Sequence, residues 1–217
     1  MTLDLSQFNA QTLRTLFQYV AQRNIHFLDQ GPGIIMRHDV DDKIENSVKI
    51  AELEKECGVK ATFFILNTAP YWSRGCWQQY HYIQSLGHEI AWHNNIITQW
   101  IQAGQRHNIS QMIATVLQQF KDQGFNITGT ASHGDSLCYQ YKYVNYEAFT
   151  CAPKVNTLNY QQTDLKTHGL LYEAYFTGHK HYLSESGGKW RMPINTEDLE
   201  NKDLRSQILI HPQWWNL

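Results

Sequence analysis

Runs of β-branched and aromatic residues alternate with segments of helical periodicity along the first half of the chain. Short apolar runs bounded by turn residues are typical of buried strands, whereas apolar residues three and four apart are typical of helices. A strand–helix–strand–helix–strand succession predicts a parallel sheet with right-handed crossovers, covered by helices. We therefore expect an α/β fold. The predicted strands are 34–36, 61–66, 89–92 and 126–130, and the predicted helices are 13–21, 43–57, 72–86 and 109–120.

Local signals set some of these boundaries. We expect Asp42 to cap the second of these helices, Glu45 to reach back to its first turn, and Gly58 to end it. The second half of the chain is less regular, with strand-like segments at 171–176 and 207–210. This succession fits both a parallel barrel and an open α/β sheet.

Length and composition indicate one globular domain spanning residues 1–217. Apolar residues make up 42% of the 217 residues and charged residues 18%, which is typical of a chain that buries a core. The formal net charge is -2 and the sequence has no cluster of Lys and Arg, so we expect no nucleic-acid partner. The 4 cysteines include no CxxC pair and are expected to be thiols.

The first residues lack the basic start and the unbroken apolar stretch of a signal peptide. No apolar run approaches the length of a membrane-spanning helix. A cytoplasmic protein without a membrane span is therefore expected.

Asp and His residues follow the predicted strands at their carboxyl ends. In parallel α/β folds this edge of the sheet builds the functional site. Since separate segments deliver such residues, we expect their side chains to converge there. They are His38, Asp39 and Asp41 after the first strand, His93 after the third, His133 after the fourth and His211 after the last.

Asp39 and Asp41 are separated by one residue, so both carboxylates point to the same side if the chain is extended. Two neighbouring carboxylates repel each other unless a cation lies beside them, and neutral imidazoles would complete the coordination of a divalent metal. One aspartate would then bind the metal while the other takes a proton from water, which the metal acidifies. His211 would protonate the leaving amine.

The same residue types also have simpler structural interpretations. An Asp-x-Asp after a strand is often a turn with a helix cap, and a single histidine is more often structural than a ligand. Trp214 and Trp215 would usually pack in the core, with a sugar-stacking platform as the alternative. We keep Glu173 and Glu185 outside the catalytic set, because a solvated or strand-edge carboxylate is the commoner case.

Three early motifs stand close together in the chain: Arg37-His-Asp-Val-Asp41, then Glu52-Leu-Glu with Gly58-Val-Lys-Ala-Thr-Phe-Phe64, then Gly87-His-Glu-Ile-Ala-Trp-His93. Three later segments accompany them: Ser132-His-Gly134, Tyr182-Leu-Ser-Glu-Ser186 with Gly188-Lys-Trp190, and Ile208-Leu-Ile-His-Pro-Gln-Trp-Trp215. Together they resemble the polysaccharide deacetylase superfamily (carbohydrate esterase family four), in a divergent branch with small cytoplasmic members. The resemblance covers nearly the whole chain, and the first two motifs with their spacing are its most specific part.

The resemblance implies a distorted (β/α) barrel of the polysaccharide deacetylase type, and a divalent metal cofactor for which zinc is the expected ion. The catalytic base and the metal-binding aspartate of the family fall on Asp39 and Asp41. Its metal-binding histidine falls on His93 and its late catalytic histidine on His211. We assign substrate binding to four residues of these motifs, Arg37, His38, Trp190 and Trp214.

The chain departs from the family pattern at three places. Where the family has a second metal-binding histidine four residues after the first, this chain has Ile97. The two aspartates are split by Val40 instead of being adjacent, which leaves open which is the base and which the ligand. The Arg-Pro motif that supports the base in the family is absent from the 132–134 segment.

These departures allow several outcomes at the metal site. Either His133 or an asparagine (Asn94 or Asn95) replaces the missing histidine, or the site binds metal weakly, or the chain is a former enzyme that only binds. We hypothesise that Asp41, His93 and His133 are the ligands, because they restore a set of two histidines and one carboxylate. Asp39 is then the catalytic base.

The sequence therefore predicts a metal-dependent hydrolase that removes an N-acyl group from a sugar, a sugar nucleotide or a lipid-linked glycan precursor. Assembly of O-antigen or capsule is the expected setting. A second possibility keeps the metal and changes the bond, as in deformylation or hydrolysis of another small amide. A third possibility is a catalytically silent carbohydrate-binding protein that keeps the deacetylase fold.

Overall fold

The computed structural model describes residues 3–72, 75–191 and 199–217. Its strands form one sheet in the order β6-β5-β4-β3-β2-β8-β7, with β1 also pairing with β2. The registers of the strand pairs are parallel. The prediction of an α/β fold on a parallel sheet is thus confirmed. Among the described strands the order is an open path from β6 to β7, which is compatible with a distorted barrel; the deacetylase type of barrel stays a prediction.

The described elements are short and are joined by loops and 3₁₀ turns. The strands are β1 Asn24–Ile25, β2 Gly33–Val40, β3 Ala61–Leu66, β4 Glu89–Asn94, β5 Gly129–Ser132, β6 Tyr172–Glu173, β7 His181–Ser184 and β8 Arg205–Ile210. The α-helices are α1 Ala10–Val20, α2 Ile44–Cys57, α3 Trp77–Ser85, α4 Ile96–Gln102, α5 Ile109–Asp122 and α6 Ser136–Tyr141.

The chain divides into two compact units. The first consists of Met1–Ile65, Ala69–Ile90 and Gly178–Leu217, and the second of Leu66–Thr68 and Ala91–Thr177. Because the first unit is assembled from three stretches of chain, the division does not produce consecutive domains. The single domain expected over residues 1–217 stays a prediction.

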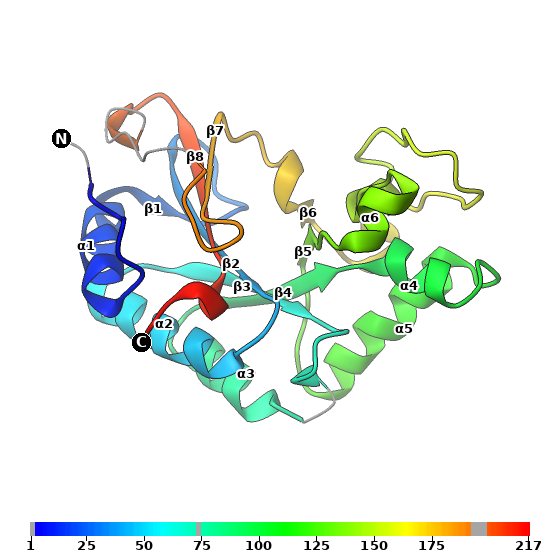
Figure 1. Ribbon diagram of the computed structural model, residues 1–217, viewed down its shortest axis with the longest axis horizontal. Coiled ribbons are helices and arrows are strands. Elements are labelled where there is room, and N and C mark those ends of the chain that lie inside the picture. The colour runs from blue at the N-terminus through cyan, green and yellow to red at the C-terminus, as the bar shows by residue number, and fades with distance from the viewer. Residues whose placement is uncertain (1–2, 73–74, 192–198) are drawn as a thin grey trace. The chain divides into compact units, whose positions relative to one another are not determined.

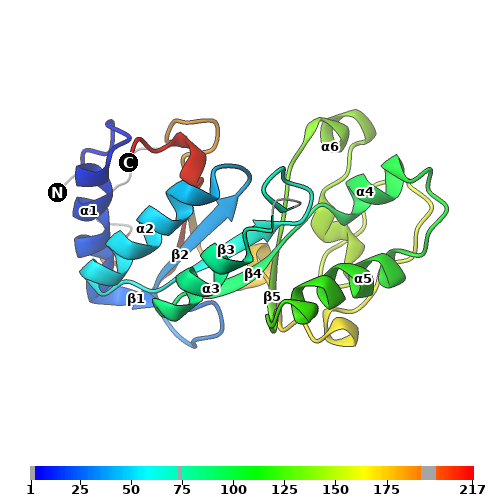
Figure 2. The same ribbon diagram turned by 90° about the horizontal axis from the view of Figure 1, so that it is seen from below.

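In the first unit, α1 and α2 lie next to each other beside the strands (Figures 1 and 2). The apolar residues of α1 three and four apart form one fully buried face, as their spacing predicts. Asn9 caps α1, since its side chain accepts a hydrogen bond from the Thr12 N–H at 3.0 Å. The packed face of α1 consists of Leu13, Leu16, Phe17 and Val20.

β2 is the strand that positions the predicted site in the first unit. It lies between β3 and β8, and all 8 of its residues are buried. It is longer than the strand predicted at 34–36, so Arg37, His38 and Asp39 lie within the strand instead of after it. β8 pairs with the first part of β2 and β3 with its last part, and a short apolar run does not reveal this pairing.

The predicted cap of α2 is wrong. Lys43 occupies the cap position in the left-handed region with φ 50, and no side chain caps the helix there. The Asp42 carboxylate accepts a hydrogen bond from the adjacent Lys43 N–H at 2.8 Å instead. The end of the helix is as predicted, because Gly58 adopts φ 77, a conformation that glycine accepts at no steric cost.

The second unit contains α4, α5, α6, β5 and β6. α5 buries the face predicted for it, including Ile113, Val116 and Phe120. The strand predicted at 126–130 lies at β5 instead, and half of the segment 171–176 forms a 3₁₀ turn after the two-residue β6. The two short helices α4 and α6 were not predicted, because neither is long enough to show a helical period.

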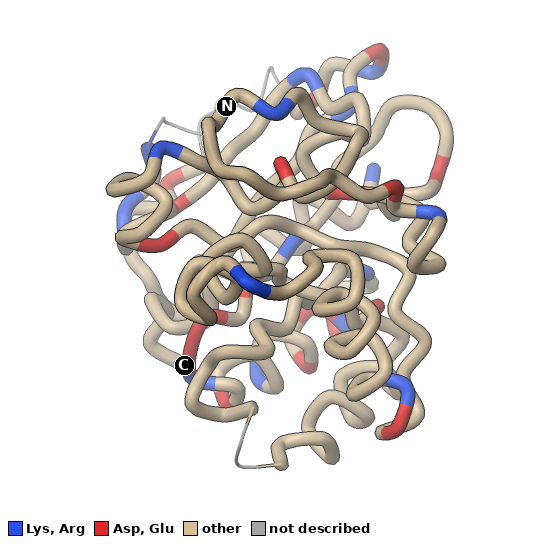
Figure 3. The backbone as a smooth tube through the Cα atoms, turned by 90° about the vertical axis from the view of Figure 1, so that its right-hand side faces the viewer, with Lys and Arg blue, Asp and Glu red and all other residues tan. Residues whose placement is uncertain are grey.

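Charge and hydropathy agree with the expectations from composition. Figure 3 shows basic and acidic residues interspersed along the chain, which carries a net charge of -2. No described helix has the length and apolar character needed to cross a membrane. The cysteines at positions 57, 76, 138 and 151 are thiols, as predicted.

Candidate metal centre

His93 and His133 form a pair of imidazoles in the second unit. His93 belongs to β4 and is buried, and His133 directly follows β5, the neighbouring strand. The parallel register pairs His93 with Ala131, so both histidines lie at the same end of the two strands. His93 Nε2 and His133 Nδ1 are 3.3 Å apart, and the two rings are at 83° to each other.

Hydrogen bonds to the backbone hold both histidines in place. His93 Nδ1 lies 2.9 Å from the carbonyl oxygen of Ala131, which only accepts, so Nδ1 carries the proton and Nε2 the lone pair. The His133 N–H donates to the Asn94 carbonyl at 2.7 Å, and Asn145 Nδ2 donates to the His133 carbonyl at 2.8 Å. Metal-binding histidines typically donate their second ring N–H to such an acceptor.

The spacing of the two ring nitrogens fits a shared metal ion. Zn–N bonds are about 2.0–2.1 Å long, so two nitrogen ligands of a tetrahedral ion are about 3.3–3.4 Å apart. His93 Nε2 and His133 Nδ1 are separated by 3.3 Å. The most frequent N–H hydrogen bonds are shorter, at about 2.9–3.0 Å. The pair is therefore arranged as two ligands would be.

Asp41 directly follows β2 in the first unit and is the carboxylate of a possible metal-binding group with His93 and His133. Gln213 steadies the carboxylate, because its Nε2 donates to Asp41 Oδ2 at 3.0 Å. A possible metal-binding triad is thus present, with the three residues that the sequence predicted. Two histidines and one carboxylate suit zinc as well as other divalent ions, so the identity of the metal stays a prediction.

The position of the missing family histidine lies in the core. Ile97 is fully buried in α4, and its N–H donates to Asn145 Oδ1 at 2.9 Å. The amide groups of Asn94 and Asn95 donate to threonine hydroxyls at 3.0 and 2.7 Å. Of the three substitutes considered from the sequence, His133 is the one that belongs to the triad.

Arg37 and Asp39 form a two-point ion pair on β2 in the first unit. They are two residues apart in a strand, so their side chains lie on the same face. Arg37 Nε and Nη2 donate to Asp39 Oδ1 and Oδ2, each at 2.7 Å, and both side chains are buried. Such a fork is strong and fixes the orientation of the carboxylate. An arginine thus supports Asp39 from its own strand, although the 132–134 segment supplies none.

His211 directly follows β8 and is oriented by Glu185. His211 Nδ1 and Glu185 Oε2 are 2.8 Å apart, and the His211 N–H donates to Glu185 Oε1. Burial lowers the pKa of His211, but the hydrogen bond to Glu185 and the charges of Asp39, Glu185 and Asp41 together raise it above its ordinary value. His211 is therefore oriented with Nδ1 toward Glu185, which leaves Nε2 as the ring nitrogen that can donate a proton to a substrate.

Two carboxylates kept outside the catalytic set turn out to support predicted site residues. Glu185 is fully buried and also accepts from the Trp215 indole at 3.3 Å. Glu173 is buried as well, and it accepts from the N–H of Ser132, next to His133, at 3.1 Å. The parallel pairing of β7 with β8 brings Glu185 beside His211. The strands predicted in the second half of the chain, 171–176 and 207–210, do not include 181–184, so this pairing was not predicted.

The four predicted substrate contacts differ in their surroundings. Arg37 and His38 have no exposed side-chain surface: Arg37 pairs with Asp39, and His38 Nε2 lies 2.8 Å from the buried carboxylate of Glu54. Both side chains are engaged with partners in the first unit, and their contact with substrate stays a prediction. Trp214 is 46% exposed and Trp190 is half-buried, and their contact with substrate stays a prediction.

Comparisons with known proteins leave the chain without an assigned family. No family model matches it, and no curated protein matches it either. The resemblance to the polysaccharide deacetylases therefore rests on the sequence motifs alone.

Proposed function

We propose that this protein is a metal-dependent hydrolase that removes an N-acyl group from a sugar or a glycan-biosynthesis intermediate. The observation that carries the proposal is the pair of His93 and His133, whose ring nitrogens are 3.3 Å apart, with Asp41 as the carboxylate of the same possible metal-binding group. His211, oriented by Glu185, supplies the proton donor that amide cleavage needs. The choice of a sugar amide follows from the motif resemblance.

The triad, Asp39 and His211 would each have a different role in the proposed reaction. A divalent ion held by the triad would polarise the amide carbonyl and acidify the attacking water. Asp39 would accept a proton from the attacking water: Arg37 fixes its carboxylate, and each carboxylate oxygen keeps a second lone pair beyond its bond to Arg37. His211 would pass a proton from Nε2 to the amine as it leaves, and the bond to Glu185, which raises the pKa of His211, favours the protonated ring.

The substrate we propose is a sugar nucleotide or a lipid-linked precursor of a surface glycan, acted on in the cytoplasm before export. This part of the proposal rests on the sequence alone. Zinc is the proposed ion, since two histidines and one carboxylate form a common catalytic zinc set.

Release of free amine from N-acylated sugars tests the proposal. Protein loaded in turn with Zn²⁺, Co²⁺, Ni²⁺ or Mn²⁺ would be incubated with N-acetyl and N-formyl amino sugars and their nucleotide-linked forms. We expect amine release that chelation abolishes, and a loss of about 10²–10⁴-fold in kcat for His211→Ala. The exposed His107→Ala serves as the control and keeps full activity. Retained sugar binding without any amine release would instead support the catalytically silent protein.

A further inference from the structure

A hollow of about 420 Å³ lies beside α6 in the second unit. This volume is within the usual range for small-molecule sites. Cys138 and Tyr139 of α6 form one part of its wall, and Tyr143, Val144 and Val155 of the following segment form another part. Figure 1 shows α6 and that segment together in the green and yellow-green part of the chain.

Two of the polar side chains that border this hollow, Tyr143 and Glu147, are engaged by the protein, whereas Lys142 is exposed at its border. The Tyr143 hydroxyl lies 2.6 Å from Thr98 Oγ1. The buried Glu147 carboxylate accepts from the N–H groups of Val144 at 3.3 Å and of Val155 at 3.1 Å. A sugar ring carries hydroxyls on every side, and each hydroxyl buried without a partner is costly. The hollow therefore suits an apolar occupant better than a sugar.

The rim of the hollow exposes apolar surface. Tyr139 is 83% exposed and Val155 is 76% exposed. Both border the hollow, so their surface is continuous with its apolar wall. Apolar surface that surrounds a concavity is typical of a binding site.

The wall of the hollow is connected with His133 through the chain and through one buried side chain. Gly134 lines the hollow and follows His133 directly, at one Cα–Cα step of about 3.8 Å. Asn145 ties the two together, because its Nδ2 donates to the His133 carbonyl at 2.8 Å and lies 3.6 Å from Cys138 Sγ. The ligand residue and the wall of the hollow thus share one buried scaffold.

Given the function proposed above, we propose that this hollow receives the acyl group of the substrate. The substrate is then an amide of an apolar acyl chain longer than acetyl. The chain enters the hollow past Tyr139 and Val155, while the amide carbonyl stays at the centre that includes His133. Hydrolysis adds the elements of water across the C–N bond, which yields a carboxylate from the acyl group and a free amine on the sugar.

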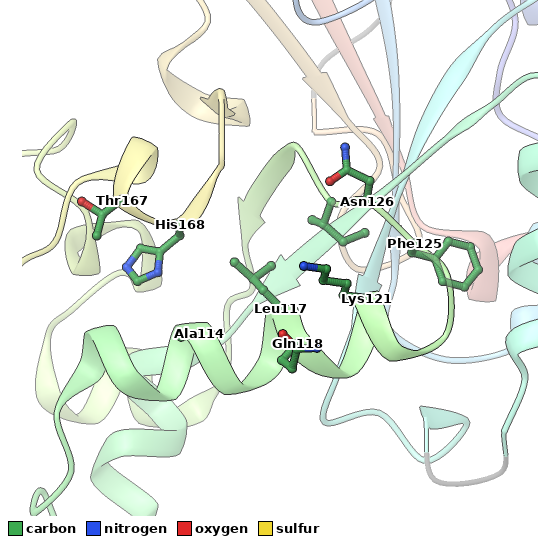
Figure 4. Close-up of a pocket in the computed structure, with 9 residues that line it drawn as sticks. Ala114, Leu117, Gln118, Lys121, Phe125, Asn126, Thr167 and His168 are labelled. Atoms are coloured by element: carbon green, nitrogen blue, oxygen red, sulfur yellow. The ribbon is translucent and has the colours of Figure 1, made fainter.

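A second hollow in the same unit provides a matched control. It has a volume of about 340 Å³ and lies along α5. Figure 4 shows it bordered by Lys121, Gln118, Asn126 and His168, whose polar groups make it a different environment. Ala114 is exposed on its border, as Val155 is on the border of the first hollow.

The test compares N-acetyl-, N-butanoyl-, N-hexanoyl- and N-octanoylglucosamine. Binding would be measured by calorimetry on metal-free protein, and amine release on metal-loaded protein. Each added CH₂ that enters the hollow contributes about 0.8 kcal/mol, so Kd should fall about fourfold per CH₂ until the hollow is full. Val155→Asp and Tyr139→Ala should remove this dependence on chain length, whereas Ala114→Asp should keep it. All three positions are exposed, so the variants are expected to fold.

Binding and activity together distinguish the failure of this inference from the failure of the proposed function. Equal Kd values along the series, or a dependence that survives Val155→Asp and Tyr139→Ala, would overturn the acyl hollow even if N-acetylglucosamine is hydrolysed. A dependence that those variants remove, without amine release from any member of the series, would support an acyl-binding hollow and contradict the hydrolase.

Discussion

At the scale of single residues, the role of His211 as proton donor depends on its pairing with Glu185. Glu185→Gln removes the charge but keeps the volume of a buried side chain. Because the bond to Glu185 and its charge raise the pKa of His211, the variant should lower that pKa. NMR titration of His211 should show this shift, and kcat should fall by about 10–100-fold, with its basic limb at lower pH. The exposed Glu45→Gln should change neither quantity. An unmoved His211 titration would contradict the assigned role of Glu185.

Residue chemistry explains both the success and the failure of the site prediction. Asp41, His93 and His133 were predictable because metal binding uses Asp and His side chains at the ends of strands. The residue types and the strand ends can both be recognised in the sequence. Glu185 was missed because its role depends on the pairing of β7 with β8, between segments that no local pattern connects. The burial of Arg37 and His38 was not predicted for a related reason: it depends on the full length of β2.

At the scale of elements, Asn145 connects α4 with the loop that carries His133. Its Oδ1 accepts from the N–H groups of Ile97 and Thr98, at 2.9 and 3.3 Å, at the first turn of α4, and its Nδ2 donates to the His133 carbonyl. The side chain of the residue before α4 provides no cap, so Asn145 performs this function from a distant position in the sequence.

Asn145→Ala should therefore weaken two features together. It leaves buried donors of α4 without their acceptor, at a cost of about 1–3 kcal/mol in the free energy of unfolding. It also loosens His133, so metal affinity should fall about 10–100-fold. Urea unfolding of the chelated protein and a metal titration measure the two effects. The exposed Asn126→Ala is the control. Loss of stability with unchanged metal affinity would contradict the link between Asn145 and the centre.

Elements with a clear period were predictable, and those defined by tertiary contacts were not. α1 and α5 have apolar faces that specify a helix by themselves. α4 and α6 span 7 and 6 residues, which is less than two turns, and they depend on distant or local polar contacts such as those of Asn145 and Asp135. Sheet order was not predictable either, since it is decided by pairing between segments far apart in the chain.

At the scale of the whole molecule, stability should depend on pH through His88. Burial lowers the pKa of His88 below its ordinary value of 6.5, against the smaller raising effects of Glu54 and the bond to the Ala51 carbonyl. In the fold, His88 Nδ1 accepts from the Ala61 N–H at 3.2 Å, which only the neutral ring can do. The unfolded chain therefore binds more protons just below pH 6.5. The contribution of His88 is complete above that pH and is lost as the pH falls.

Urea unfolding of chelated protein at pH 7.5 and pH 5.5 measures this dependence. The free energy of unfolding should fall on acidification, and His88→Gln should reduce the difference between the two pH values. The exposed His107→Gln should leave the difference unchanged. A pH dependence identical in wild type and His88→Gln would contradict the assignment to His88.

We propose that Asp41, His93 and His133 bind one divalent metal ion, and elemental analysis tests this binding directly. Protein purified without added metal or chelator would be compared with Asp41→Ala, His93→Ala, His133→Ala and the exposed control His107→Ala. We expect close to one equivalent of metal in the wild type and the control, and a large loss in each of the other three variants. Metal content unchanged in His133→Ala, or absent from wild-type protein even after reconstitution, would contradict it.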